Sequence, residues 1–550
     1  MGVETIIRNA HVITMDGDGE GSRVQAIAID GGRVRAIGSN EAINPLAGAD
    51  TRVLDLSGRT VLPGFIDSHV HFMQTGLGNL GPQVYGVTSR NAVLDIAADA
   101  AGKATPGQPL LLHGCCLHDL DVPLTLDDLD RIAPRNPLAV MDLGAHASVF
   151  NSAAWELLHL PSGTPGIGVS SEGTLSGLLH GSANTRARYV YYNEVIDDET
   201  RVAALHRASR MALELGITTV HALDGGSDDG RGWLPQRDVE VLMDVQSRLP
   251  VRTVVYFQST RVDLARRWGL PRIGGCVWVD GSYFEHTAGL LEPYDDQPCN
   301  CGNLYFAQRE LDTFVWEAHR AGLQVSMHAI GDAAIDQLLV AFERALQKDP
   351  RTDHRHRIEH FSLPTPGHIE RAARLGVVAS MQPNFAAHPP MDESGRRIRR
   401  GLEALLGAER FERRHPYRRL LDAGILVAGG SDSDPEPMGP LIGVQQLASH
   451  PETARRLTPY EALRLYTVNG ARAAFEETDK GSIGVGKFAD LVVLADDPLS
   501  ADPTTLANIP VELTMVSGVA RYCASNLEHI LGRFAPYSTG YMQSRPINQE

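Results

Sequence analysis

The chain has 550 residues, of which 43% are hydrophobic and 21% are charged, a balance typical of a soluble globular protein with a large core. Its 50 Lys and Arg residues against 67 Asp and Glu residues leave a formal charge of −17, which argues against nucleic acid or an anionic membrane surface as a main partner. No apolar run approaches the ~18 residues that a membrane-spanning helix needs, and the first residues show no export signal, so we expect a cytoplasmic protein.

The two ends of the chain predict short strands separated by turns. The N-terminal strands are expected at residues 5–9, 11–15, 25–30, 33–37 and 52–55, and the C-terminal strands at residues 488–494 and 511–516. Each end is too small to bury a core alone. We therefore predict that residues 1–60 and 481–533 pair into one β-sandwich domain, followed by a polar, extended tail at residues 534–550.

Between these ends, short apolar strands alternate with helical stretches such as residues 201–215 and 311–321. The strands are expected at residues 61–66, 217–222, 251–257, 276–279, 324–328, 357–360, 377–381 and 425–429. Because this alternation favours parallel pairing, we predict an α/β fold, a (β/α)₈ TIM-like barrel over residues 61–480. The stretch from about residue 73 to residue 200 is too long for a loop, and we interpret it as an inserted lid or subdomain.

The strongest chemical signal follows the first of these strands, in the segment Pro63-Gly64-Phe65-Ile66-Asp67-Ser68-His69-Val70-His71. Residues i and i+2 of a strand point to the same face, so His69 and His71 project together at the end of a buried strand. Barrel enzymes keep their active sites at this end of their strands. Two imidazoles on one face can share a metal cation at about 2.0–2.1 Å per bond.

Three further strand ends supply groups of the same kind. His328 ends the strand at residues 324–328, His360 ends the strand at residues 357–360, and Asp432 follows the last strand. For a single histidine, a place in the core or on the surface is the simpler explanation. Because several groups are placed alike, we predict a metal site at the mouth of the barrel.

Taken together, these motifs resemble those of the metal-dependent amidohydrolase superfamily, within its amidohydrolase-3 or YtcJ-like group, which includes the N-substituted formamide deformylases. The resemblance spans almost the whole chain. It is carried by His69–His71, Gly216-Ile217-Thr218-Thr219-Val220-His221, Asp280-Gly281-Ser282, Leu290-Leu291-Glu292-Pro293-Tyr294, His328-Ala329-Ile330-Gly331-Asp332, His356-Arg357-Ile358-Glu359-His360, Gln382-Pro383, Gly430-Ser431-Asp432 and Gly486-Lys487-Phe488-Ala489-Asp490-Leu491. The resemblance implies that His69, His71 and Asp432 hold a more buried metal ion, and that His328 and His360 hold a more exposed one.

One position departs from the pattern of these relatives. They commonly bridge two metal ions with a carboxylated lysine, four residues before the Asp-Gly-Ser motif, where this chain has Cys276. None of the four lysines of the chain lies on a predicted barrel strand. A thiolate can bridge two zinc ions at about 2.3 Å and restores the missing negative charge. We therefore predict that Cys276 bridges the metals; a buried, inert Cys276 beside a single metal ion is the alternative.

Imidazole and thiolate form a borderline-soft set of ligands, which favours Zn²⁺. We expect one or two zinc ions per chain, although other divalent ions fit the same ligands.

Four further residues are candidates for substrate binding. His146 lies in the inserted segment, His221 ends the second strand, and His286 follows Glu285 where relatives often carry a small residue and Arg. Tyr283 is a candidate for shaping an apolar pocket, whereas we expect its neighbour Trp278 to pack in the core.

From this site we predict a hydrolase that cleaves a C–N amide-type bond, other than a peptide bond, in a small molecule such as an N-substituted formamide. The expected nucleophile is a metal-bound hydroxide, with Asp432 as general base and then general acid. Two alternatives stay open. One is an N-acyl amino acid, carbamate, cyclic amide or lactone as substrate of the same centre, and the other is a catalytically inactive scaffold. The resemblance also implies a homodimer.

Overall fold

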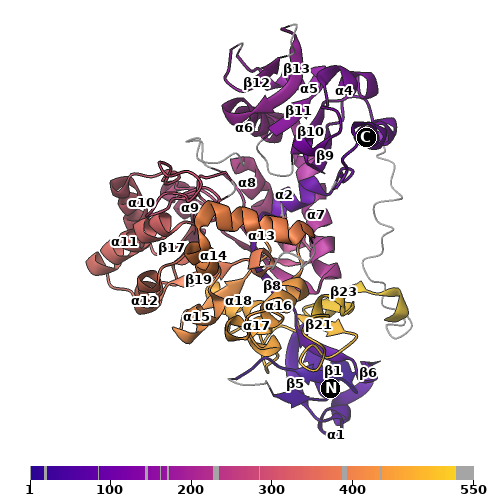
Figure 1. The fold of residues 1–550 in the computed structure, drawn as a ribbon. Coiled ribbons are helices and arrows are strands. Elements are labelled where there is room, and N and C mark those ends of the chain that lie inside the picture. The colour runs from indigo at the N-terminus through magenta and orange to yellow at the C-terminus, as the bar shows by residue number, and fades with distance from the viewer. Residues whose placement is uncertain are drawn as a thin grey trace.

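A computed structural model describes residues 2–17, 22–84, 86–142, 147–161, 163–169, 173–226, 235–283, 285–386, 393–433 and 437–527. The predicted tail at residues 534–550 lies outside these ranges. Figure 1 shows the inserted segment at one end of the molecule and the strands from the two chain ends at the other. Over the described ranges, none of the helices is both long and apolar enough to cross a membrane.

The two ends of the chain meet in one sheet, whose strand order is β23-β22-β21-β7-β2-β3. A second sheet, β5-β4-β1-β6, is built from N-terminal strands. The strands are β1 (Val3–Arg8), β2 (His11–Ile13), β3 (Arg23–Val24), β4 (Ala26–Asp30), β5 (Arg33–Gly38), β6 (Ala47–Asp55), β7 (Thr60–Pro63), β21 (Leu491–Leu494), β22 (Val511–Val516) and β23 (Val519–Cys523). Ile7, Val12, Leu491 and Leu513 share one core between them, so both ends contribute to burying it.

The middle of the chain forms parallel strands in chain order. One sheet has the order β15-β14-β8 and another has β16-β17-β18-β19-β20. The strands are β8 (Phe65–Val70), β14 (Ile217–Ala222), β15 (Arg252–Val255), β16 (Arg272–Ile273), β17 (Gln324–Ala329), β18 (Arg357–His360), β19 (Val378–Met381) and β20 (Val427–Gly429). Isolated parallel bridges between Phe257 and Ile273, and between Val70 and Ser433, span the two gaps between these sheets.

Two predicted strands were wrong. The stretch at residues 61–66 is two strands, because β7 pairs with β21 in the terminal sheet while β8 pairs with β14. The stretch at residues 276–279 is not a strand, because β16 ends at Ile273 and a bulge follows. Gly274 and Gly275 have φ angles of +98° and +57° there, and a Cβ on Gly274 would lie 1.9 Å from the carbonyl oxygen of Ser326. The bulge therefore places Cys276 in a turn.

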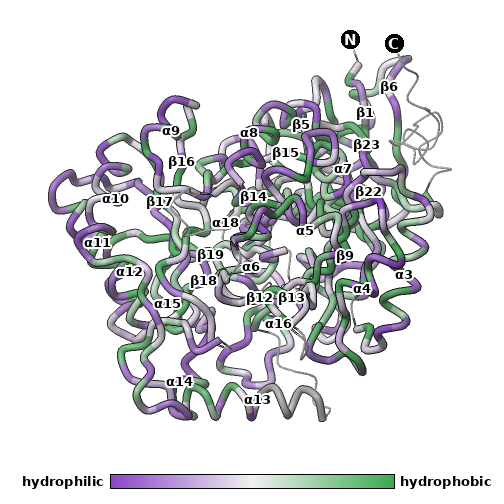
Figure 2. Tube along the Cα trace, turned by 90° about the horizontal axis from the view of Figure 1, so that it is seen from above, coloured by the Kyte–Doolittle hydropathy of each residue, from purple (hydrophilic) through white to green (hydrophobic). Residues whose placement is uncertain are grey.

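Helices follow most of the parallel strands, and α7 and α10 confirm the two helices predicted above. The helices are α7 (Asp198–Glu214), α8 (Gln236–Val245), α9 (Val262–Arg267), α10 (Gln308–Arg320), α11 (Asp332–Lys348), α12 (Pro366–Leu375), α13 (Glu393–Leu406), α14 (Ala408–Arg413), α15 (Tyr417–Asp422), α16 (Pro440–Ala448), α17 (Pro459–Leu465) and α18 (Val468–Ala473). Helix α10 buries Leu311, Phe314, Val315 and Ala318, the spacing of one helical face. Hydrophobic and hydrophilic stretches accordingly alternate along these outer helices in Figure 2.

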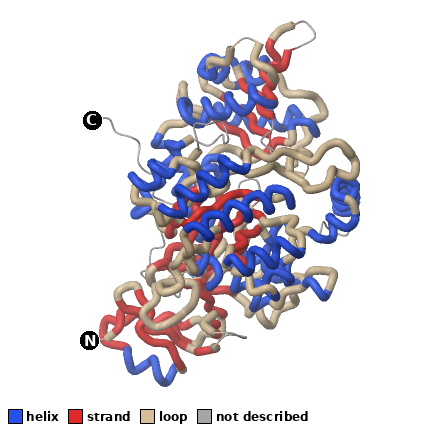
Figure 3. Tube along the Cα trace, turned by 90° about the vertical axis from the view of Figure 1, so that its left-hand side faces the viewer, coloured by secondary structure: helices blue, strands red, loops and turns tan. Residues whose placement is uncertain are grey.

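The inserted segment has a sheet and a core of its own. Its strand order is β12-β13-β11-β10-β9, and Leu112, Leu129, Val140 and Val149 lie in its core. Its elements are α3 (Arg90–Lys103), β9 (Leu110–Cys115), α4 (Leu126–Ile132), β10 (Leu138–Asp142), β11 (Ala147–Phe150), α5 (Ser152–Leu158), β12 (Ile167–Val169), β13 (Leu175–His180) and α6 (Gly181–Val190). Two other helices precede it in the chain: α1 (Asn40–Ile43) in the terminal region and α2 (Phe72–Gly78) directly after β8. Figure 3 shows these strands set apart from the central parallel strands.

Candidate metal centre

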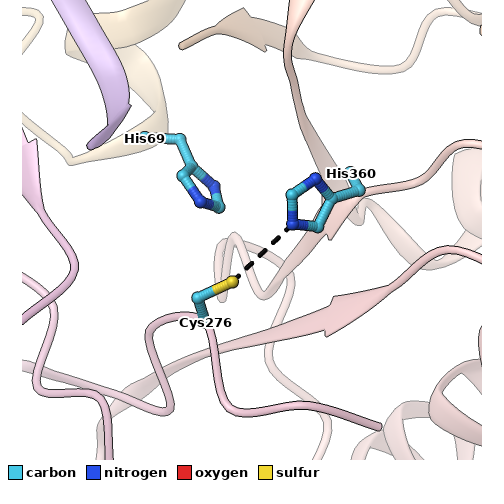
Figure 4. Close-up of side chains that lie close together, drawn as sticks. All are labelled: His69, Cys276 and His360. Atoms are coloured by element: carbon cyan, nitrogen blue, oxygen red, sulfur yellow. Dashed lines mark hydrogen bonds between the residues drawn. The ribbon is translucent and has the colours of Figure 1, made fainter. Parts of the chain in front are cut away.

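The predicted metal ligands lie together at one end of the parallel strands. His69 is near the end of β8, His328 near the end of β17, His360 is the last residue of β18, and Asp432 follows β20. Cys276 reaches the same place from the turn after β16. Figure 4 shows His69, Cys276 and His360 pointing toward one another from three separate segments.

Asp432 joins the two histidines of the His-x-His motif. Its Oδ1 lies 3.1 Å from Nε2 of His69 and 3.2 Å from Nε2 of His71. One ligand atom from each of these three residues lies within 4.8 Å of the others, as a shared metal ion requires. This trio corresponds to the more buried of the two metal positions that the sequence predicts.

Cys276 joins the other two histidines. Its Sγ lies 3.7 Å from Nδ1 of His328 and 3.7 Å from Nε2 of His360. A second group with ligand atoms within 4.8 Å of one another consists of His69, Cys276 and His360. Because His69 belongs to both groups, the two clusters are contiguous and Cys276 lies beside each of them.

Each of the four histidines has its other ring nitrogen held by an oxygen acceptor. Nδ1 of His69 contacts Oε2 of Glu359 at 2.6 Å, Nδ1 of His71 contacts the carbonyl of Leu223 at 3.0 Å, Nδ1 of His360 contacts Oε1 of Gln382 at 2.8 Å, and Nε2 of His328 contacts the carbonyl of Gly281 at 3.3 Å. An oxygen acceptor fixes the proton on that nitrogen and leaves the lone pair of the opposite one for a metal.

The ionised side chains around the centre favour a bound cation. Burial alone would raise the pKa of Cys276, but the neighbouring imidazoles, His69 first, hold it well below its ordinary value. Burial also acts to raise the pKa of Asp432, yet His69 and His71 hold it well below its ordinary range. Burial alone would lower the pKa of His71, but Asp432 and Cys276 raise it to about 10. A thiolate and a carboxylate thus draw positive charge into a buried site.

The residues fit a divalent metal. His69 is fully buried, and within the described residues its Nε2 makes no hydrogen bond of good geometry, although Oδ1 of Asp432 lies 3.1 Å away. A polar atom in this position costs free energy unless it has a partner, and a metal ion is one. The nitrogen, sulfur and oxygen donors around it are the ligands of zinc proteins.

The backbone is strained at two of the ligands. His360 has a φ angle of +70° and Asp432 one of +59°, in a backbone region that residues other than glycine rarely adopt. Such conformations persist where the surrounding structure enforces them, and they cluster at functional sites. Both residues place their side chains in the centre, His360 against Cys276 and Asp432 against His69.

Sequence reasoning gave no role to the residues that hold the histidines. Glu359 is fully buried and receives hydrogen bonds at Oε1 and Oε2 from Arg357, at 2.7 and 3.0 Å, besides contacting His69. Burial acts to raise the pKa of Glu359, but Arg357 and His69 lower it strongly, so it is a carboxylate. Asp280 accepts backbone hydrogen bonds from Ile330 and Gly331, and its Oδ1 lies 3.4 Å from Nε2 of His328. These residues lie inside the quoted motifs, and their clustering with histidine was the available signal.

The substrate-binding candidates are placed differently. His146 lies outside the described residues. His221 is fully buried and its Nδ1 contacts the buried Arg357 at 3.0 Å, so its side chain is part of the protein interior. Tyr283 is buried in a cluster with Leu290 and Tyr294.

His286 is the fourth substrate-binding candidate, and Trp278 is the residue that was expected in the core. Nε2 of His286 pairs with Oδ2 of Asp296 at 2.9 Å. Trp278, expected in the core, is 37% exposed, because it stands at the end of the bulge after β16.

Known proteins share this arrangement over most of the chain. A family model described as "Amidohydrolase family" matches residues 52–522. The chain is 30% identical over 533 residues to a putative amidohydrolase YtcJ of Bacillus subtilis (strain 168), covering 92% of this chain and 97% of that protein. It is 29% identical over 562 residues to an N-substituted formamide deformylase of Arthrobacter pascens, covering 94% and 98%.

A solved structure agrees with these relatives. An uncharacterized metal-dependent hydrolase from Pyrococcus furiosus superposes with a TM-score of 0.76 at 25% identity, covering 90% of this chain and 100% of that one. The chain therefore belongs to the amidohydrolase family, and the predicted family resemblance is confirmed. These comparisons support the general class of metal-dependent hydrolases for this chain.

Proposed function

We propose that this protein is a zinc-dependent hydrolase that cleaves the C–N bond of a small, non-peptide amide. The observation that carries the proposal is the convergence of four histidines, Cys276 and Asp432, with the outer ring nitrogen of each histidine held by an oxygen acceptor. A divalent cation bound there would act as a Lewis acid that makes water nucleophilic near neutral pH and polarises a carbonyl.

Asp432 would transfer the proton. Its carboxylate is ionised at neutral pH, because the surrounding imidazoles lower its pKa, so it can accept a proton from the attacking water. The water oxygen forms a bond to the carbonyl carbon, and the same proton then passes from Asp432 to the nitrogen as the C–N bond breaks. An amine leaves poorly unless it is protonated, so one carboxylate in both roles is sufficient.

Cys276 would serve both clusters. Its thiolate lies 3.7 Å from the facing nitrogens of His328 and His360 and shares a ligand group with His69. This placement supports the proposal that Cys276 takes the place of the carboxylated lysine of related enzymes, with two zinc ions per chain. A single ion with Cys276 inert is the other outcome that a metal measurement can give.

We also propose that the parallel strands close into one (β/α)₈ barrel. Their appearance in chain order, and the bridges Phe257–Ile273 and Val70–Ser433 at the two gaps, support closure. Residues 1–60 and 481–533 would then form the accompanying β-sandwich.

A substrate panel with metal analysis tests the function. Purified, zinc-loaded protein is assayed with N-substituted formamides, acetamides, N-acyl amino acids, carbamates and lactones, while elemental analysis measures zinc per chain. We expect near-stoichiometric zinc and release of an amine and a carboxylic acid from one amide class. Turnover confined to lactones or carbamates would contradict the C–N amide proposal. Protein that takes up no zinc and hydrolyses nothing would instead indicate a scaffold.

A further inference from the structure

The helix that follows the His-x-His motif begins without a cap of its own. Helix α2 starts directly after His71, which is its N-cap residue. An N-cap side chain ordinarily accepts a hydrogen bond from one of the first helical amides, but the side chain of His71 makes no such bond among the described residues. Its imidazole instead contacts Asp432 and the carbonyl of Leu223. The residue in the capping position is thus engaged in the candidate metal centre.

Helix α2 depends on its surroundings more than a long helix does. It has only seven residues, including Gly76 and Gly78, and a helix this short and rich in glycine is unstable alone. All seven residues are buried, so its first amides must find partners within the protein. Figure 1 shows α2 beside α7, and a Cβ on Gly76 would lie 2.1 Å from the carbonyl oxygen of Ala204. An unpaired amide at the start of α2 would therefore cost free energy.

Asp224 supplies the missing cap from another strand. Its Oδ1 and Oδ2 accept from the amide of Met73, at 3.2 and 3.3 Å. Met73 is the second residue of α2, and the amide of the second or third residue is the one that an N-cap side chain bonds. Asp224 follows the end of β14 by two residues and is fully buried. Helix α2 is therefore capped by a residue 151 positions away in the chain.

The backbone next to Asp224 holds His71 itself. The amide of Leu223 donates to the carbonyl of Val70 at 2.9 Å, and the carbonyl of Leu223 contacts Nδ1 of His71 at 3.0 Å. The carbonyl of Asp224 accepts from the amide of Gln258, after β15, at 3.0 Å. Leu223 and Asp224 are thus fixed by β15 and bond to residues before, at and after His71.

We propose that Asp224 is a positioning residue for the metal ligand His71. By capping α2 in place of the N-cap side chain, it fixes the backbone that follows His71 and leaves the imidazole available to the metal centre. Without this cap, we expect the start of α2 to open and Nε2 of His71 to lose its place 3.2 Å from Oδ1 of Asp432. The inference rests on the proposed metal site, but it holds for whichever substrate the centre takes.

Two substitutions at Asp224 separate capping from other effects. Asp224→Ala removes the acceptor, whereas Asp224→Asn keeps an oxygen that can accept from Met73. Burial, with Asp238 next, raises the pKa of Asp224 to about 7, so a neutral amide in its place changes the charge of the interior little. Thr125→Ala is the matched control, because Thr125 is the N-cap of α4 in the inserted segment and accepts from the amide of Asp128 at 3.3 Å.

Hydrogen exchange in metal-free protein tests the cap without zinc. Mass spectrometry follows the amides of α2 and α4 in the unmodified chain and in the three variants. We expect exchange in α2 to become about 2–30-fold faster in Asp224→Ala, to stay near that of the unmodified chain in Asp224→Asn, and to be unaffected in Thr125→Ala, where only α4 responds. Unchanged exchange of α2 in Asp224→Ala, or equal acceleration throughout the chain, would overturn the proposal.

Zinc affinity tests the effect on His71. It is measured in the same variants by competition with a chromogenic chelator. We expect Asp224→Ala to weaken the binding of one ion per chain by about 10–100-fold, with Asp224→Asn and Thr125→Ala within about threefold of the unmodified chain. Equal affinity in Asp224→Ala and the unmodified chain would show that the cap does not place His71, and would overturn the proposal.

The same measurements separate this inference from the proposed function. If the unmodified chain binds zinc and hydrolyses no amide, while Asp224→Ala shows both effects, the positioning role stands and the hydrolase function fails. If amides are hydrolysed and Asp224→Ala changes neither exchange nor zinc affinity, the hydrolase function stands and the positioning role fails. An unmodified chain that takes up no zinc would overturn both.

Discussion

Two clusters of histidines lie at opposite ends of β18, and they use the same side chain in different ways. The candidate metal centre at the C-terminal end contains His69, His71, His328 and His360. At the N-terminal end, His356 immediately precedes β18 and contacts His319, from α10, and His354.

The structural cluster satisfies every ring nitrogen within the protein. His356 accepts a hydrogen bond from the amide of Val325 at Nδ1, at 3.0 Å, and its Nε2 donates to Nδ1 of His319 at 2.9 Å. Nε2 of His319 donates to the carbonyl of Asp349, at 2.8 Å. His354 accepts at Nδ1 from the amide of His356 and donates from Nε2 to the carbonyl of Leu375, at 2.9 and 2.7 Å.

In the metal centre, by contrast, one nitrogen of each ring contacts an oxygen outside the ligand set, and the other nitrogen faces the thiolate of Cys276 or the carboxylate of Asp432. The difference teaches that burial alone does not identify a functional histidine. What identifies it is a lone pair directed at an anion-lined centre rather than at a backbone donor.

The largest effect should come from Asp432→Asn. The amide keeps an oxygen near His69 and His71 but cannot accept a proton, so we expect kcat to fall by roughly 10²–10⁴-fold. Turnover of the best amide and zinc per chain are measured together. A variant with near-normal kcat would show that another group carries the proton.

Glu359→Gln sharpens the comparison at the level of metal affinity. The substitution removes the charge that receives the Nδ1 proton of His69 and leaves Arg357 buried without its carboxylate. We expect zinc affinity to fall by about 10–100-fold, measured by competition with a chromogenic chelator. Unchanged affinity would mean that Glu359 only balances Arg357.

Cys276→Ser should lower the zinc content from two ions to near one per chain if the thiolate bridges. Cys115→Ser is the matched control, because Cys115 is also a buried free cysteine but lies on β9 in the inserted segment. Elemental analysis after dialysis reports both variants. Two ions in Cys276→Ser would exclude the thiol as the bridge.

His356→Ala should break the other cluster and leave the metal centre intact. The variant leaves the buried amide of Val325 and Nδ1 of His319 without partners. We expect the free energy of unfolding to fall by about 1–3 kcal/mol, with zinc affinity unchanged. Thermal denaturation with a zinc titration checks both, and a loss of zinc binding would contradict the separation of the two clusters.

The smallest and most diagnostic effect is on pH dependence. Burial, with His354 next, holds the pKa of His356 well below 6.5. The unfolded chain therefore binds more protons than the native one in acid. The stability that His356 contributes is complete above pH 6.5 and is lost as the pH falls through its lowered native pKa.

In metal-free protein the pKa of His71 has the opposite shift, to about 10, where Asp432 and Cys276 outweigh burial. Its contribution is fully present below pH 6.5 and is lost as the pH rises toward 10. Urea unfolding of metal-free protein across pH 5–10 should therefore show His356→Ala flattening the acid limb and His71→Ala the alkaline limb. The same limb flattened by both variants would contradict the assigned shifts.

Much of the fold could be predicted from local pattern. The apolar strands before His328 and His360, and the helices at α7 and α10, appear close to where periodicity placed them. The misplaced elements were those where long-range pairing wins. Residues 61–66 form a continuous apolar run, and only their two different partners, β21 and β14, divide it into β7 and β8.

The candidate site divides in the same way. His-x-His on a strand, and histidine or aspartate at other strand ends, are local signals that residue type and spacing carry. The partners of those ligands are not local: the contact of His69 with Glu359 joins residues 290 positions apart, and Asp432, which contacts His71, follows the last of the parallel strands. Likewise, no local pattern predicts that Trp278 is exposed, because the bulge at Gly274 sets the direction of the segment.

Residue chemistry along the chain was thus enough to indicate an α/β protein with metal-ligating groups at its strand ends, since side-chain type and periodicity are properties of short segments. Which nitrogen of each histidine faces the centre, and which histidines instead stabilise the interior, depended on packing between distant strands. Hydrogen-bond partners are chosen by that packing, because a ring nitrogen takes its role from whichever donor or acceptor the fold brings within about 3 Å.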